Sequence, residues 1–273
     1  MTLESKDVYF KGAQRAFYDK RYSIAGRALN KFSNTLMLFY DKRLFKLINS
    51  KFGGSALVRV LEVGAGQGSD AVTLSETSEE VVAIDISRGA LLTAKTLSKL
   101  TRTQDKISVI QADAENLPFR EGIYDAVYSR DVLHHVTNSI LSVKEMKRVA
   151  KEKAKVVAIE ANGLNPQMVV IGFLYYSVDH GVFRNTSTYL SNIFVKAGLK
   201  QVQIAETEFF PRHVFFEYRS PLNHFFVSHS FRIIELLAKL ESSFQKNSFF
   251  SKFSNYLVVS ASKITTPDEA NGI

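Results

Sequence analysis

The sequence predicts an α/β protein whose mostly parallel sheet is flanked by helices. Two observations support this. Between residues 57 and 160, short runs rich in β-branched residues alternate with stretches of helical periodicity. The first of these runs ends in a glycine-rich turn that precedes another helical stretch. Strands that alternate with helices are typical of βαβ units, in which neighbouring strands lie parallel.

Seven strands are expected in all. Five fall in the alternating region, at residues 57–63, 81–85, 107–111, 124–129 and 154–160, with helices at 90–100 and 140–150. A further helix is expected to begin at a cap on Thr186 or Ser187 and to end at Gly198. The last two strands are predicted at 201–206 and 256–262. About fifty residues separate them, too many for a hairpin turn.

The flanking segments differ from this central region. Apolar residues recur at helical spacing over residues 33–48, and Gly53 and Gly54 then break the pattern. Residues 209–253 contain twelve Phe and Tyr residues, with a helix expected over 225–244. We therefore predict four parts: a basic helical segment that forms part of a lid (1–55), a ligand-binding domain (56–207), an aromatic-rich insertion with the last strand (208–263) and a disordered tail (264–273).

Composition narrows the class of protein. The chain has 273 residues, 35 basic and 27 acidic side chains and no cysteine. The length suits one large domain with additions. Without cysteine there is no disulfide framework, no thiolate zinc site and no cysteine nucleophile, and we expect no metal site. The longest apolar run, residues 168–176, is shorter than the roughly 20 residues that span a bilayer, so a cytoplasmic protein is expected.

The net charge of +8 is concentrated near the N-terminus. Residues 1–55 hold eleven Lys and Arg against four Asp and Glu. One interpretation is a pair of solvated amphipathic helices. The other is attraction to an anionic partner, such as lipid headgroups, a phosphorylated substrate or RNA. Charge alone does not separate these partners.

The glycine-rich turn carries the functional signal. Glu62, Gly64, Gly66 and Gly68 form the pattern E-x-G-x-G-x-G directly after the first strand. Glycine there allows positive φ and lets the backbone approach a ligand closely. Asp85 ends the second strand, where an acidic group can accept both hydroxyls of a ribose. Both elements lie at the carboxyl ends of strands, where open α/β sheets bind ligands.

This pattern resembles the class I S-adenosylmethionine-dependent methyltransferases, in particular the small-molecule group typified by ubiquinone and sterol methyltransferases. Three further stretches match at the expected spacing: Asp85 in VVAIDIS, Asp113 in QADAENLPF, and YDAVYSRDVLHHV at 124–136. The resemblance covers about residues 57–160. It implies a Rossmann-like seven-stranded fold, S-adenosylmethionine as cofactor, Asp85 as the ribose-binding acid and Asp113 as the group that binds the adenine amine.

The chemistry of that cofactor agrees with these residues. Ribose hydroxyls and the adenine amine are donors, so carboxylates suit them, while the sulfonium favours aromatic faces or carbonyl oxygens. The resemblance extends to Tyr18, which is similar to a tyrosine near the cofactor's amino-acid end. The full set of predicted cofactor contacts is Tyr18, Glu62, Gly64, Ala65, Gly66, Gln67, Gly68, Asp85, Ile86, Asp113, Ala114, Ser129 and Arg130.

Methyl transfer from a sulfonium is an in-line displacement, in which the protein mainly aligns the two reactants. A general base is needed only where the acceptor must lose a proton. The loop after the fourth strand offers Asp131, His134 and His135, and the fifth strand ends in Glu160. These four residues are the predicted catalytic candidates.

The aromatic insertion and the basic N-terminus favour a small or lipid-like acceptor, with contact to an anionic membrane surface as a possible addition. The missing cysteine argues against cytosine C5 methylation, and Ser129-Arg-Asp-Val argues against adenine amino methylation. The alternative function is methylation of RNA or protein, docked on the basic N-terminal helices. A cofactor-binding module without catalysis stays open. A nicotinamide dehydrogenase is disfavoured, because Ser69 stands where its fingerprint needs glycine.

Overall fold

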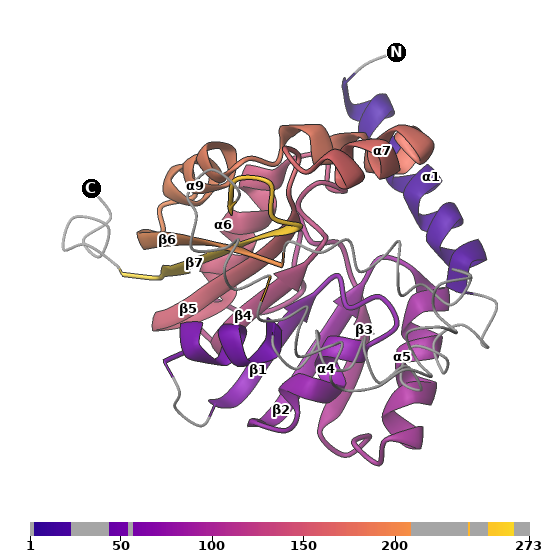
Figure 1. Cartoon of the computed structure of the whole chain (residues 1–273). Helices are drawn as coiled ribbons and strands as arrows, with labels where there is room; N and C mark the ends of the chain where they lie inside the picture. Colours follow the sequence, from indigo (N-terminus) through magenta and orange to yellow (C-terminus); the bar gives the residue numbers. More distant parts are fainter. Residues whose placement is uncertain (1–2, 23–43, 54–56, 209–239, 241–250, 265–273) are drawn as a thin grey trace.

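A central sheet organises the molecule (Figure 1). The computed structural model describes residues 3–22, 44–53, 57–208, 240 and 251–264. Within this part of the chain, seven strands form one sheet in the order β3-β2-β1-β4-β5-β7-β6. Their bounds are Leu57–Val63 (β1), Ser78–Asp85 (β2), Ile107–Gln111 (β3), Tyr124–Arg130 (β4), Ala150–Ala161 (β5), Lys200–Thr207 (β6) and Tyr256–Ser262 (β7).

The sheet is mostly parallel, which confirms the predicted fold class. Strands β1 to β5 pair in parallel, and β7 runs antiparallel to both β5 and β6. All seven residues of β7 are buried, as expected for a strand with neighbours on both sides and helices over both faces. The strand order reverses between β1 and β4, which are adjacent. In open α/β sheets the ligand crevice lies at this position.

The structure corrects the starts of two strands by more than one residue, and the first is β2, which begins at Ser78 and not at residue 81. We predicted that the fifth strand begins at residue 154, but β5 begins at Ala150, which pairs with Tyr124 across a register shift. Its first residues, Lys151 to Lys153, are exposed, and Lys153 adopts a positive φ of 65°. Because residues 151–153 face solvent, they lack the apolar residues from which the strand was predicted.

Helices precede, connect and cover the strands. Their bounds are Leu3–Tyr22 (α1), Ser69–Leu74 (α4), Arg88–Leu100 (α5), Ser139–Val149 (α6), Pro166–Leu174 (α7), Tyr176–Asp179 (α8), the 3-10 helix His180–Arg184 (η1) and Ser187–Lys196 (α9). The predicted cap on α9 is confirmed, since the Thr186 side chain accepts from the Tyr189 N–H. Residues 44–51 are also helical. The rest of the predicted helix at 33–48, the helix at 225–244 and the tail lie outside the described residues.

Two apolar clusters form the core. One packs β-strand side chains against α6 and α9, with Met146 and Phe194 fully buried. The other packs the opposite set of strand side chains against α4 and residues 44–52, through Leu44 and Leu74 among others. In Figure 1, α1 and α7 lie above the carboxyl ends of the strands. In the described part of the chain, no helix is both long and apolar enough to cross a membrane.

Candidate functional site

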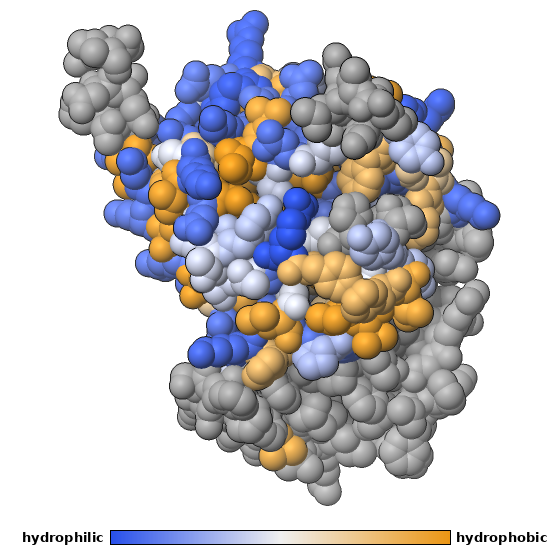
Figure 2. All heavy atoms as spheres, turned by 90° about the horizontal axis from the view of Figure 1, so that it is seen from above, coloured by the Kyte–Doolittle hydropathy of each residue, from blue (hydrophilic) through white to orange (hydrophobic). Residues whose placement is uncertain are grey.

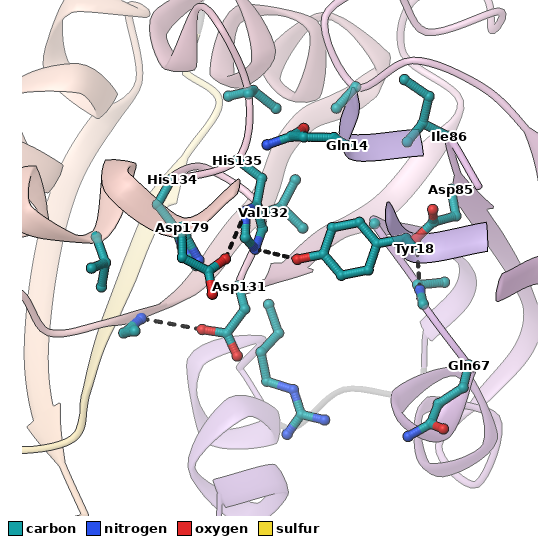
Figure 3. A pocket seen from close by; sticks show the side chains of 18 of the residues that line it. Gln14, Tyr18, Gln67, Asp85, Ile86, Asp131, Val132, His134, His135 and Asp179 are labelled. Carbon is teal, nitrogen blue, oxygen red and sulfur yellow. Dashed lines mark hydrogen bonds and ion pairs between the residues drawn. The ribbon is translucent and has the colours of Figure 1, made fainter. Parts of the chain in front are cut away.

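A cavity of about 880 Å³ opens at the carboxyl ends of β1 and β4, where the strand order reverses. The glycine-rich turn after β1, the loop after β4 and residues of α1 and α7 line it. Figure 3 shows Gln14 and Tyr18 of α1 beside the histidine loop and Asp85. The polar side chains on its wall include Glu62, Asp85, Asp113 and His135, which come from four different strand ends. The fold therefore gathers the predicted site residues from across the sequence.

The glycine turn fits its surroundings only without side chains. Gly64 has a φ of 72°, and a Cβ there would lie 2.2 Å from Val132 Cγ2. Gly68 has a φ of 79°, and a Cβ there would lie 2.7 Å from the Cβ of Ala94 on α5. Both distances are too short for real Cβ contacts. The turn thus packs directly against Val132 and Ala94, and its backbone lines the cavity.

Asp85 organises the turn. Its Oδ2 accepts from the Gly66 N–H at 2.8 Å, and its Oδ1 accepts from the Ser87 N–H at 2.8 Å. Burial raises the pKa of Asp85, although backbone hydrogen bonds from Ser87, Gly66 and Ile86 oppose that shift. Each carboxylate oxygen keeps a second lone pair for a ligand, so Asp85 can accept hydrogen bonds from a diol.

Glu62 is the most enclosed acid of the cavity wall, with only 3% of its surface exposed. Burial and the nearby Asp70 carboxylate raise the pKa of Glu62 well above its usual range. Its Oε2 has no hydrogen-bond partner among the described residues. Asp70 itself is held by Arg130 at 2.6 Å and by the Tyr128 hydroxyl at 2.8 Å. A buried acceptor without a partner is costly unless a ligand donates to it.

Helix α1 reaches the opposite side of the cavity. Lys11 Nζ lies 2.6 Å from Asp113 Oδ2 and also contacts the Glu115 carboxylate. Burial would lower the pKa of Lys11, but the two carboxylates outweigh burial and raise it. Asp19 accepts from the Ser87 hydroxyl at 2.6 Å and from the Gly89 N–H at 2.8 Å. These contacts fasten α1 to the loops after β2 and β3.

His134 is tied to a buried acid. Its Nδ1 lies 2.6 Å from Glu160 Oε2, and Glu160 has no exposed surface. Glu160 also accepts from the backbone N–H groups of Val132 and Leu133 at 3.0 and 2.7 Å and from Asn185 at 3.2 Å. Burial would lower the pKa of His134, but the charge and hydrogen bond of Glu160, together with the charges of Asp131 and Asp179, outweigh burial and raise it. Four donors thus surround Glu160, and it is absent from the cavity wall.

His135 lies between a tyrosine and a carboxylate (Figure 3). The Tyr18 hydroxyl is 2.9 Å from His135 Nε2, and Asp179 Oδ1 is 3.4 Å from His135 Nδ1. Asp131, at the end of β4, has a positive φ of 54°, and its Oδ1 accepts from the Ala161 N–H at 3.2 Å. The two histidine rings lie 4.0 Å apart between their centroids.

Most of the predicted site residues line the cavity. Those that do are Tyr18, Glu62, Gly64, Ala65, Gly66, Gln67, Asp85, Ile86, Asp113, Ala114, Arg130, Asp131, His134 and His135. Gly68, Ser129 and Glu160 lie behind the wall. Asp179 and the apolar wall of α7 also line the cavity but were not among the predicted site residues. For α7, the cap Asn165 followed by Pro166 is a helix start signal that was present in the sequence.

Comparison with known proteins gives the family context. A profile described as methyltransferase domain matches residues 61–158. A demethylmenaquinone methyltransferase of Renibacterium salmoninarum is 31% identical over 128 residues, which are 47% of this chain and 52% of the relative. The ubiquinone/menaquinone biosynthesis C-methyltransferase UbiE of Geobacter sp. strain M21 is 28% identical over 57% of this chain and 64% of the relative. The chain thus spans only part of the length of these relatives.

Solved structures share the fold over a longer stretch. Phosphoethanolamine N-methyltransferase 2 of Haemonchus contortus, solved with S-adenosyl-L-methionine, superposes with a TM-score of 0.58 at 18% identity. The match covers 82% of this chain and 53% of that one. At 18% identity, this similarity shows a common fold and nothing more.

Proposed function

We propose that this protein is a class I, S-adenosylmethionine-dependent methyltransferase that methylates a small, lipid-like acceptor, in keeping with the methyltransferase domain profile that matches residues 61–158. The observation that carries the proposal is the cavity, which joins the glycine turn and Asp85 to an apolar wall from α7. One end of it suits a nucleoside with an amino acid, and the other suits an apolar molecule. The distant quinone methyltransferase relatives agree with such an acceptor.

The residues of the turn fit S-adenosylmethionine. The backbone of Gly64 lines the cavity, Asp85 offers two oxygens for a ribose, and the orphan Oε2 of Glu62 can accept from an amino group. Asp113 is proposed to accept from the adenine amine, and one of its oxygens already accepts from Lys11. Arg130 holds Asp70 against the same wall. Donors on the cofactor would meet acceptors on the protein at each position.

When bound, S-adenosylmethionine supplies an activated methyl group. The chain's own part is to hold the acceptor in line and to exclude water. Of the four catalytic candidates, His134 and His135 have ring nitrogens near the cavity that could take a proton from an acceptor. Glu160 and Asp131 are proposed as positioning residues, since Glu160 orients His134 and Asp131 binds the Ala161 N–H.

The acceptor class is tested with methyl-labelled S-adenosylmethionine in a crude extract. We expect label in the organic-solvent fraction with the wild-type protein and none with Asp85→Ala. Label confined to RNA or protein would contradict the proposal and would support the basic N-terminus as a docking face. Against that alternative, Lys11 points inward, to Asp113 and Glu115.

The rim of the cavity suggests where the acceptor comes from. Residues 164–178 contain no charged side chain, and Val170, Phe173, Leu174 and Tyr176 are between 57% and 74% exposed. Tyr9 on α1 is 71% exposed, and Phe17 of α1 contacts Tyr175. Figure 2 looks down on this end of the molecule, where hydrophobic residues gather. We propose that this surface rests on a membrane that holds the acceptor.

The membrane proposal predicts binding to vesicles of anionic phospholipid. The double variant Val170→Ser/Phe173→Ser should bind about thirtyfold more weakly, because each change removes apolar surface worth about 1 kcal/mol at an interface. The matched control is Leu92→Ser/Leu100→Ser on α5, where both leucines are 58% exposed. Equal co-sedimentation of the two double variants would contradict the proposal.

A further inference from the structure

Three side chains with metal-binding atoms meet beside the cavity. His134, His135 and Asp179 each bring one such atom within 4.8 Å of the other two. The histidines follow β4, whereas Asp179 ends α8, so the fold and not the sequence brings them together. Figure 3 shows the Asp179 carboxylate directed at the two rings. All three residues line the cavity wall.

Each histidine has one ring nitrogen engaged on the side away from Asp179. His134 Nδ1 contacts Glu160, and His135 Nε2 contacts the Tyr18 hydroxyl. Histidines that bind metals are typically held in this way, because a partner on one nitrogen fixes the tautomer and aims the lone pair of the other. His135 Nδ1 faces Asp179 Oδ1 at 3.4 Å, and a cation between them would take His134 Nε2 and His135 Nδ1 as its nitrogen ligands.

The segment that carries Asp179 packs tightly on the histidine loop. A Cβ on Gly181 would lie 1.9 Å from the His134 carbonyl oxygen, so η1 rests directly on the backbone of this loop. Asn185, which follows η1, donates to Glu160 and to the Ala161 carbonyl oxygen, both at 3.2 Å. The segment that follows Asp179 is therefore packed directly on the loop that carries the two histidines.

We propose that His134, His135 and Asp179 bind one divalent cation of the zinc type, with its remaining position open to the cavity. Two imidazole nitrogens and one carboxylate oxygen are a ligand set of catalytic zinc sites, which keep one position for water or substrate. The open position would hold an oxygen of the methyl acceptor and favour its ionised form. This last role, unlike the binding itself, rests on the proposed function.

Cobalt(II) titration of the purified, tag-free protein tests the site, since tetrahedral cobalt with nitrogen and oxygen ligands absorbs visible light. We expect one Co²⁺ per chain, displaced by Zn²⁺, and affinity at least about tenfold lower in Asp179→Asn and in His135→Gln. The matched control is Asp105→Asn, which removes an exposed carboxylate before β3. Equal cobalt affinity in the wild type, both site variants and the control would overturn the proposal.

S-adenosylhomocysteine binding, measured on the same samples, separates the two proposals. Normal S-adenosylhomocysteine binding in Asp179→Asn shows that this variant is folded, so a loss of cobalt binding there supports the cation site. A wild type that binds S-adenosylhomocysteine but no cobalt would overturn the cation site alone. A wild type that binds cobalt but no S-adenosylhomocysteine would instead overturn the proposed function.

Discussion

Replacement of Asp85 by alanine is expected to weaken the binding of S-adenosylhomocysteine by about 100-fold or more. A hydrogen bond to a charged group is worth about 1.5–3 kcal/mol, and two ribose hydroxyls would donate to this carboxylate. The variant also frees the N–H groups of Gly66 and Ser87, which Asp85 now holds at 2.8 Å. The loss therefore combines a missing ligand contact with a looser turn. Isothermal titration calorimetry measures it directly.

Two further variants make the Asp85 test specific. Asp85→Asn keeps one acceptor oxygen, so its loss of affinity should be smaller than that of Asp85→Ala. Glu80→Gln removes a carboxylate from the same strand, where Glu80 pairs with Arg59 outside the cavity. Its affinity should match the wild type. Wild-type affinity in Asp85→Ala would contradict the assignment of the cofactor site.

Replacement of Glu160 by alanine should lower the free energy of unfolding by about 3–5 kcal/mol. The change leaves the backbone N–H groups of Val132 and Leu133 and the ring of His134 without their buried partner. Glu121→Ala is the control, because the side chain of Glu121 is 70% exposed in its ion pair with Lys263, and its loss should lower the free energy of unfolding by less than about 1 kcal/mol. Urea unfolding compares the two variants with the wild type.

The Glu160 effect should depend on pH. Because the Glu160 charge raises the pKa of His134 in the folded protein, the pair stabilises most below the unfolded pKa of about 6.5. This contribution is lost as pH rises through the folded pKa. The difference in unfolding free energy between wild type and Glu160→Ala should thus be larger near about pH 6 than near about pH 9. A difference that is independent of pH would show that His134 carries no proton in this pair.

The sheet could be predicted from the sequence because its strands are short apolar runs with clear ends. The ranges expected for β1, β3 and β7 agree with the structure residue by residue. The glycine turn could be predicted because its positive φ angles require glycine at Gly64, Gly66 and Gly68, and this spacing is visible in the sequence. Asp85 could be predicted because it ends the next strand. Gly64 must be glycine, since any side chain would collide with Val132.

The positions of Asp179 and Glu160 could not be predicted from the sequence in this way. Asp179 belongs to a four-residue helix with no periodicity, and nothing local pairs it with His135. Glu160 was expected to face the crevice because it ends a strand. Its four donors come from the loop after β4 and from Asn185, and they turn it into the core instead. Such roles depend on tertiary contacts between distant segments.

The position of β7 has a consequence for how this protein is made. β7 lies between β5 and β6, although it follows both in the chain. While the ribosome is still adding the residues before 256, β6 has no neighbour in the sheet and one edge of β5 is open. Unpaired edges of this kind attract other chains. The nascent protein therefore depends most on chaperones just before its last strand emerges, and a premature stop before residue 256 would leave an aggregation-prone product.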